Sequence, residues 1–145
     1  MRQPVTDAVI AWLEEHGHVL TLVGPLIHGD ETEWAEASAV TAGTVARGDA
    51  DAAVLFCWSG TGASIAANKV AGARAALCGD AETARMARKY NHANVLVLSL
   101  RATSPAVAVE TTEAFLDAPW GEDAFDHRNV GVVNALDRGG SPPLG

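Results

Sequence analysis

The sequence predicts an α/β fold: a Rossmann-like, three-layer α/β/α sandwich built around a parallel sheet. Residues 52–56 and 95–98 are short, continuous apolar runs, which are typical of strands buried on both faces of a parallel sheet. Segments with helical spacing of apolar residues, such as residues 4–15, alternate with these runs. The first buried run leads through a glycine-containing loop into a helical pattern, the order expected at the carboxyl end of a strand.

The individual elements follow from local signals. Pro4 suits the first turn of a helix, and Val5, Val9 and Leu13 share one face of it. Asp80 is a good N-cap for the helix that follows it. We expect helices at residues 4–15, 33–46, after 62, 81–89, 105–116 and 126–136, and strands at residues 19–23, 52–56, 74–78 and 95–98.

Composition and charge narrow the class of function. The chain has 145 residues, enough for one domain with its own core, which we place at residues 1–138 with a flexible tail at 139–145. A net charge of −8 argues against broad binding to nucleic acid or to acidic membranes. The two cysteines show neither zinc-ligand spacing nor a disulfide framework, and we find no signal peptide or membrane-spanning run, so we expect a cytoplasmic protein.

The loop after the first buried run is the candidate binding site. Cys57 ends the strand, and Gly60 and Gly62 let the backbone turn tightly and approach a ligand closely. Free N–H groups at the start of the next helix favour an anion. The spacing matches neither a Walker A loop nor a clean dinucleotide fingerprint. On residue chemistry alone, Cys57 is more simply interpreted as a small buried hydrophobic residue.

A longer stretch around this loop carries a family resemblance. Residues 57–76 read CWSGTGASIAANKVAGARAA, and residues 91–96 form a second matching block. These motifs closely resemble the signature of the ribose-5-phosphate isomerase B and galactose-6-phosphate isomerase family, and the resemblance covers residues 5–136. It implies an aldose–ketose isomerase of a phosphorylated sugar, of the ribose 5-phosphate/ribulose 5-phosphate type in the pentose phosphate pathway, that needs no metal and no organic cofactor.

The resemblance also assigns the chemistry to particular residues. Cys57 matches the family's catalytic cysteine and is expected to act as the base that moves a proton between neighbouring carbons through an enediolate. Ser59 keeps the hydroxyl of the family's usual Thr. With the N–H groups of Gly60, Thr61 and Gly62, it is expected to stabilise the enediolate oxygen and hold the substrate. Family sites lie at subunit interfaces, which implies a homodimer or tetramer.

The sequence departs from the family pattern where the sugar ring is opened and the phosphate is bound. Tyr90 replaces the usual ring-opening His, and His92 replaces an Asp two residues later; of the two, we expect Tyr90 to touch the substrate. Asn91 matches a position that contacts sugar hydroxyls. Arg128 aligns with one phosphate-binding arginine, whereas the second is missing. Arg101 matches a family position that a structural ion pair would explain equally well.

The family's usual first strand, which ends in an Asp-His turn, has no counterpart before the first helix, so its Asp and His cannot be assigned here. In a doubly wound sheet such a strand is interior, and its loss predicts unpaired backbone edges and a slot in the core. Either Met1 is an internal methionine of a longer natural chain, which we favour, or this lineage fills the gap differently.

Two other functions stay open. The missing first strand and the missing arginine fit a catalytically degenerate or hetero-oligomeric, non-catalytic subunit of the same family, whereas Cys57 and the intact glycine loop argue against it. A nucleotide-binding module is a third and weaker hypothesis.

Overall fold

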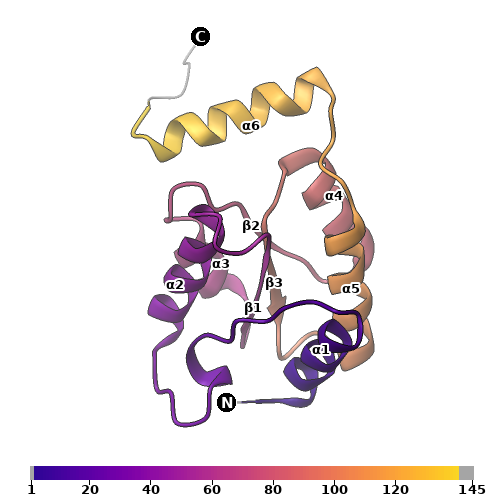
Figure 1. Ribbon diagram of the computed structural model, residues 1–145. Coiled ribbons are helices and arrows are strands. Elements are labelled where there is room, and N and C mark those ends of the chain that lie inside the picture. The colour runs from indigo at the N-terminus through magenta and orange to yellow at the C-terminus, as the bar shows by residue number, and fades with distance from the viewer. Residues whose placement is uncertain (1, 141–145) are drawn as a thin grey trace.

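A parallel sheet lies at the centre of the computed structural model, which describes residues 2–140 (Figure 1). Its strands are β1 (Ala53–Cys57), β2 (Ala75–Leu77) and β3 (Val95–Ser99), and their order across the sheet is β1-β3-β2. Cys57 is in register with Ser99, and both β1 and β2 run parallel to β3. The carboxyl ends of the strands therefore lie together at one end of the sheet, where parallel sheets bind their ligands.

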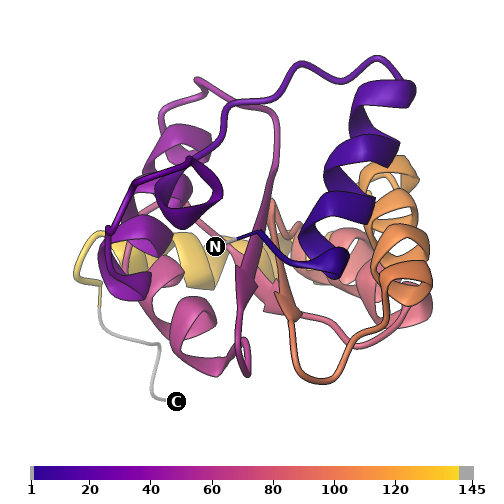
Figure 2. The same cartoon turned by 90° about the horizontal axis from the view of Figure 1, so that it is seen from below.

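Helices cover both faces of the sheet, so the predicted α/β/α sandwich is confirmed (Figures 1 and 2). One face carries α2 (Trp34–Ala46) and α3 (Thr61–Ala67), and the other carries α1 (Pro4–Glu15), α4 (Ala81–Asn91) and α5 (Pro105–Asp117). A short 3₁₀ helix, η1 (Gly24–Leu26), precedes α2, and α6 (Ala124–Asp137) crosses the amino end of the sheet. Because α6 lies at the amino end, it does not cover the carboxyl end, where the loop after β1 lies.

β3 joins the two halves of the core. All five of its residues are buried, because strands flank it on both sides and helices cover both of its faces. Leu96 and Leu98 pack on the side of α1, α4 and α5, where Phe115 is fully buried. Val95 and Val97 pack on the side of α2 and α3. This alternation is the pleat of a strand, and it explains why the sequence here is a continuous apolar run.

β1 is an edge strand that pairs only with β3 among the described strands. The Ala53 N–H donates to the Asn94 carbonyl at 3.1 Å, and the Leu100 N–H donates to the Cys57 carbonyl at 2.9 Å. Because the backbone polar groups of a strand alternate in direction, those of Val54 and Phe56 point to the open side. The sheet therefore has the unpaired edge that the sequence predicts.

The predicted strand at residues 19–23 is wrong. The segment is extended where it enters η1, with Val23 at φ −133° and ψ 142°, but it belongs to no sheet. Its residues favour strands, yet a strand forms only where the free edge of another strand lies within reach. This segment does not pair with β1. Leu20 packs against the core beside α1 instead, and Val19 is 98% exposed.

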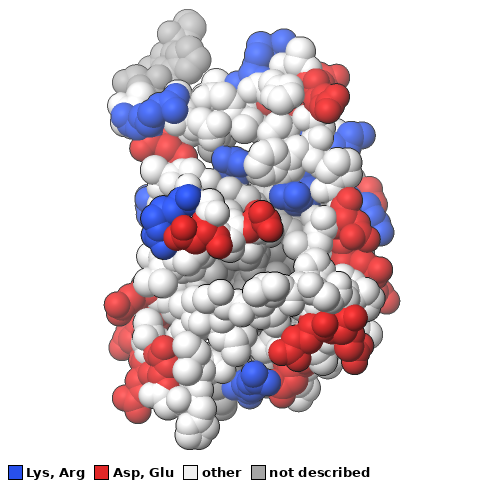
Figure 3. All heavy atoms as spheres, in the orientation of Figure 1, with Lys and Arg blue, Asp and Glu red and all other residues white. Residues whose placement is uncertain are grey.

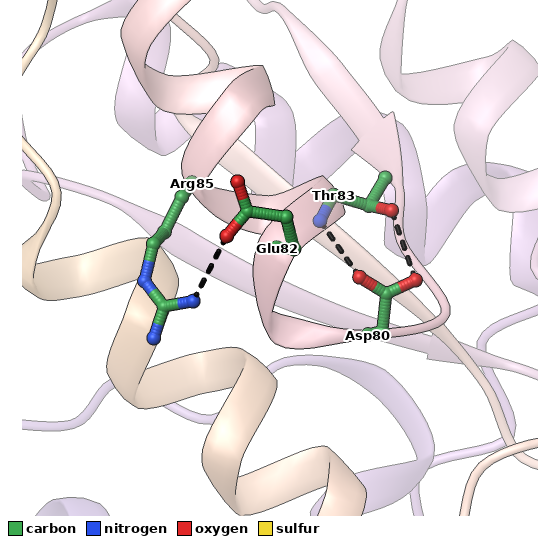
Figure 4. Close-up of polar contacts among 4 residues, drawn as sticks. All are labelled: Asp80, Glu82, Thr83 and Arg85. Atoms are coloured by element: carbon green, nitrogen blue, oxygen red, sulfur yellow. Dashed lines mark hydrogen bonds and ion pairs between the residues drawn. The ribbon is translucent and has the colours of Figure 1, made fainter.

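The start of α4 matters because this helix carries Tyr90 and Asn91. Asp80 is its N-cap, as predicted: the carboxylate accepts from the Thr83 N–H at 2.8 Å and from its hydroxyl at 2.9 Å (Figure 4). These hydrogen bonds lower the pKa of Asp80. The neighbouring ion pair of Glu82 with Arg85, at 3.2 Å, is exposed, so it contributes little to stability.

Other boundaries differ by a few residues. α4 continues two residues beyond the prediction, and α6 begins two residues earlier, because Asp123 caps α6 by accepting from the Phe125 N–H. Of the predicted tail, residues 139 and 140 are described and close α6, with the Gly139 N–H donating to the Leu136 carbonyl; residues 141–145 lie outside the described part. None of the helices in residues 2–140 combines the length and apolar character needed to cross a membrane.

Candidate active site

The loop after β1 places Cys57 at the carboxyl end of the sheet. The segment after β3 holds the start of this loop: the Trp58 carbonyl accepts from the Arg101 N–H at 3.1 Å and from the Ser99 hydroxyl at 3.0 Å. The Cys57 side chain is partly exposed. A thiol in this position can meet a ligand bound over the strand ends.

The second cysteine shows what a structural thiol looks like in the same sheet. Cys78 follows β2, and its N–H donates to the Val97 carbonyl. It is 1% exposed, and burial, with a smaller contribution from the charge of Asp80, raises the pKa of its thiol to about 11. The prediction that Cys78 is a small buried hydrophobic residue is confirmed, whereas the same interpretation does not fit Cys57.

Geometry requires the two glycines of the loop. Gly60 has φ 82°, a left-handed conformation that favours glycine, and a Cβ there would overlap a δ-methyl group of Leu77. A Cβ at Gly62 would lie 2.9 Å from Cζ3 of Trp34. The predicted tight turn and close approach are both present, although at Gly62 the approaching group is the Trp34 ring.

Several polar side chains surround this loop. The hydroxyls of Ser59 and Thr61, both exposed, lie 2.8 Å apart. Arg101 is exposed at the end of the strand next to Cys57, and its side chain makes no ion pair with any described residue. The alternative of a structural ion pair for Arg101 is therefore not seen. The carboxyl end thus gathers Cys57, Ser59, Gly60, Thr61, Gly62 and Arg101.

Two residues of this region escaped the sequence analysis. Ser99 lies beside Cys57 in register, and its hydroxyl supports the loop. Trp34 begins α2, is 55% exposed and packs on Gly62. A paired register marks Ser99 only once the strand order is known. Trp34 is likewise recognised only from its packing on Gly62, which the local sequence does not encode.

Tyr90 and Asn91 lie far from Cys57 within the same chain. They end α4, just before β3 begins at Val95, whereas Cys57 is in register with the last residue of β3. Four residues of a parallel strand span about 13 Å. Both side chains are exposed at the amino end of the sheet. One chain therefore does not bring the predicted catalytic residues Tyr90 and Cys57 together.

His92 holds the chain segment that leads into α6. Its φ of 50° ends α4, and its side chain is buried. The ring stacks on Trp120 at 5.1 Å between centroids, with 1° between the ring planes, and its Nε2 lies 2.9 Å from the Gly121 carbonyl. Because the His92 ring is buried against Trp120 and Gly121, it anchors the connection between α5 and α6. Of the two candidates for contact with a sugar, Tyr90 is therefore the more exposed.

Arg128 belongs to the amino end as well. It is exposed on α6, with its guanidinium carbon 6.0 Å from the centroid of the Phe125 ring. The predicted site residues thus form two groups, and Arg128, Tyr90 and Asn91 make up the second. Within residues 2–140, no three or more His, Cys, Asp or Glu side chains are grouped so that they could hold a metal ion.

A parallel α/β sandwich with a thiol and a glycine loop at the carboxyl end of one strand matches a known class of isomerases. The ribose/galactose isomerase family model matches residues 3–132. Ribose-5-phosphate isomerase B of Mycobacterium leprae is 33% identical over 131 residues, covering 90% of this chain and 80% of that protein. The chain therefore belongs to the ribose/galactose isomerase family and is an aldose–ketose isomerase.

Solved structures agree with the family assignment. The Trypanosoma brucei type B ribose 5-phosphate isomerase aligns with a TM-score of 0.85 and 38% identity, covering 92% of this chain and 90% of that one. Ribose-5-phosphate isomerase B of Clostridium thermocellum aligns with a TM-score of 0.86 and 29% identity, covering 93% and 90%. The fold described here therefore matches that of type B ribose 5-phosphate isomerases over most of each chain.

Proposed function

We propose that this protein interconverts ribose 5-phosphate and ribulose 5-phosphate, with Cys57 as the base. The observation that carries the proposal is the partly exposed Cys57 thiol at the carboxyl end of β1, directly before a turn that only glycine accommodates at position 60. The names of the M. leprae and T. brucei relatives support the choice of substrate.

The reaction moves one carbon-bound proton. The Cys57 thiolate takes the proton from C2 of the open-chain aldose, and electrons flow to O1 to form an enediolate. The Ser59 hydroxyl and the N–H groups of residues 60–62 stabilise the oxygen that gains charge. The thiol then returns the proton to C1, and a proton moves from O2 to O1, which leaves the ketose. Atoms and electrons balance without a cofactor.

The complete site is proposed to need two copies of the chain. Tyr90, Asn91 and Arg128 lie at the amino end of the sheet, and Cys57 at the carboxyl end, so a second copy must supply one of the groups. Exposed apolar side chains on α6 give such a partner a surface to bury: Phe125 (64% exposed), Val133 (44%) and Leu136 (46%). A homodimer, or a tetramer of two dimers, satisfies both requirements.

Conversion of ribose 5-phosphate by the purified chain tests this proposal. Cys57→Ala is expected to lower kcat by about 10²- to 10⁴-fold while the fold and the oligomer stay intact. Cys78→Ala is the matched control, because it removes the other thiol, and it is expected to retain turnover. Equal turnover in wild type and Cys57→Ala would rule out the thiol as the base.

A hetero-oligomeric, non-catalytic subunit is the second candidate. It is favoured by the same separation of the two groups, since an unlike partner could complete the site just as a second copy could. The chain on its own would then form a folded oligomer without turnover, and activity would appear only on adding the unlike subunit.

A further inference from the structure

A cavity of about 430 Å³ lies beneath α6 at the amino end of the sheet. Its polar lining comes from Asn68, Arg74, Tyr90, Asn91 and Asn129, and alanine and valine side chains complete it. None of the lining residues carries a carboxylate, and the volume suits a small metabolite. Blue atoms lie directly beneath α6 on the face drawn in Figure 3. The cavity therefore offers donors and positive charge.

Arg74 is held firmly at this cavity. Its Nε donates to the His92 carbonyl at 2.8 Å, and its Nη1 donates to Asn134 Oδ1 at 3.3 Å. Its guanidinium carbon lies 5.3 Å from the centroid of the Trp120 ring. Of the five N–H donors of an arginine, these bonds use two, which leaves three for a ligand. The position of the fork is thus fixed before any ligand binds.

The charge of Arg74 is not neutralised within the described chain. Burial lowers the pKa of its guanidinium, and the charge of Asp137, which itself accepts from the Gly72 N–H, opposes that effect only in part. Arg88 lies nearby and is also half-buried; desolvation and the charge of Arg74 lower its pKa. Neither arginine forms an ion pair with a described carboxylate.

Carbonyl oxygens and the Trp120 ring, rather than carboxylates, hold the guanidinium groups of Arg74 and Arg88. The chain has 18 Asp and Glu residues against 10 Lys and Arg, yet two neighbouring half-buried arginines lack a carboxylate partner. A buried charge without a counter-charge destabilises a fold unless hydrogen bonds or a ligand compensate for it. A fixed guanidinium and amide N–H groups recognise carboxylate and phosphate oxygens, and a phosphate monoester offers three such oxygens to the three free N–H donors of Arg74.

We propose that the cavity beneath α6 is a phosphomonoester-binding site in which Arg74 is the principal ligand. Asn91, Asn129 and the Tyr90 hydroxyl supply further hydrogen bonds from α4 and α6. The ligand is either the phosphate of the substrate reacting at the Cys57 loop of a second copy, which rests on the proposed function, or a free phosphorylated metabolite.

Fluorescence titration tests the site independently of turnover. A Trp34→Phe/Trp58→Phe background removes the two exposed indoles beside the Cys57 loop. Of the two that remain, Trp12 on α1 stacks on His16 and does not line the cavity, so it adds a constant signal. Trp120, in contrast, reports on the guanidinium groups of Arg74 and Arg88. Inorganic phosphate is expected to change the emission saturably, with a Kd of about 1 mM or below. No saturable change at about 10 mM phosphate would overturn the proposal.

Matched variants separate binding from loss of structure. Asn129→Asp puts a negative charge at the cavity and is expected to weaken phosphate binding about tenfold or more, whereas Asn129→Ala changes it only about twofold. Arg74→Lys keeps the charge but loses the fork, and is expected to weaken binding about tenfold. Arg85→Met removes an exposed arginine that lines a different cavity and leaves binding unchanged. Equal affinities in Asn129→Asp and Asn129→Ala would contradict an anion site.

Ribose 5-phosphate distinguishes the two sources of the ligand. If the ligand is the substrate, ribose 5-phosphate binds at least about tenfold more tightly than phosphate, and Arg74→Lys raises KM in the isomerase assay. If it is a free metabolite, the two bind alike and KM stays unchanged. Phosphate binding is measured without turnover, so the titration stays informative even if the isomerase proposal fails. Cys57→Ala in the same background is accordingly expected to bind phosphate as tightly as the parent.

Discussion

The two ends of the sheet carry different chemistry. The carboxyl end has a partly exposed thiol, two hydroxyls and a glycine turn, and the exposed Arg101 follows β3 there. The amino end has the half-buried Arg74 and Arg88, amide side chains and stacked aromatic rings. On the proposed function, this difference assigns proton transfer and anion binding to opposite ends of one chain, so each end can be changed without the other.

The largest expected effect on turnover comes from mixing two inactive variants, one changed at the carboxyl end of the sheet and the other at the amino end. Cys57→Ala lowers turnover by about 10²- to 10⁴-fold, and Tyr90→Phe/Asn91→Ala is expected to lower it by about 10²-fold. If each site combines the carboxyl end of one copy with the amino end of another, a mixed dimer of these two variants contains one intact site. Refolding the inactive variants together should then restore about a quarter of wild-type activity.

The readout is activity against mixing ratio, and each variant refolded alone is the control. Activity should be greatest at equal amounts of the two variants, since half of the dimers are then mixed. A mixture as inactive as its components would show that Cys57 and Asn91 do not serve one shared site.

Replacing Gly60 tests whether local backbone geometry builds the carboxyl end. Gly60→Ala places a Cβ in the left-handed region and against a δ-methyl group of Leu77, so the free energy of unfolding should fall by about 2–4 kcal/mol. Gly131→Ala is the control: it lies within α6 with no heavy atom within 4 Å of its Cβ, and it should stabilise by about 0.5–1 kcal/mol. Urea unfolding measures both, and equal stabilities would show that the turn tolerates a side chain.

Much of this architecture could be predicted from the sequence, and the failures have physical causes. The runs at residues 52–56 and 95–98 became β1 and β3 because burial on both faces demands unbroken apolar sequence. Residues 19–23 have the same local pattern, yet strand formation depends on a neighbouring edge, which the local sequence does not encode.

The candidate site shows the same division. The glycines and Cys57 could be predicted because their roles are local: a positive φ at Gly60 and a thiol at a strand end. Arg74 was missed as a candidate ligand, because the groups that fix its guanidinium lie 18 to 60 positions away in the sequence, such as the His92 carbonyl and the Asn134 side chain. Separation of Tyr90 from Cys57 likewise follows from the register of β3.

The smallest expected effect concerns the two thiols at the carboxyl ends of β1 and β2. The pKa of Cys78 is raised from 9.0 to about 11 by burial, so the folded chain keeps a proton that the unfolded chain releases above pH 9.0. The protonated Cys78 thiol therefore adds about 2–3 kcal/mol to the free energy of unfolding. This stabilisation is fully present below pH 9.0 and is lost as the pH rises through about 11. Unfolding of wild type and Cys78→Ala at pH 8 and at pH 11 should therefore show a gap in stability that narrows as the pH rises.

Iodoacetamide at pH 8 provides the second measurement: it should modify Cys57, which is partly exposed, and leave Cys78 unmodified until the chain unfolds. A pH-independent gap together with equal alkylation of both cysteines would mean that the carboxyl end holds two accessible thiols, and Cys57 would lose its distinction as the only reactive one in the described chain.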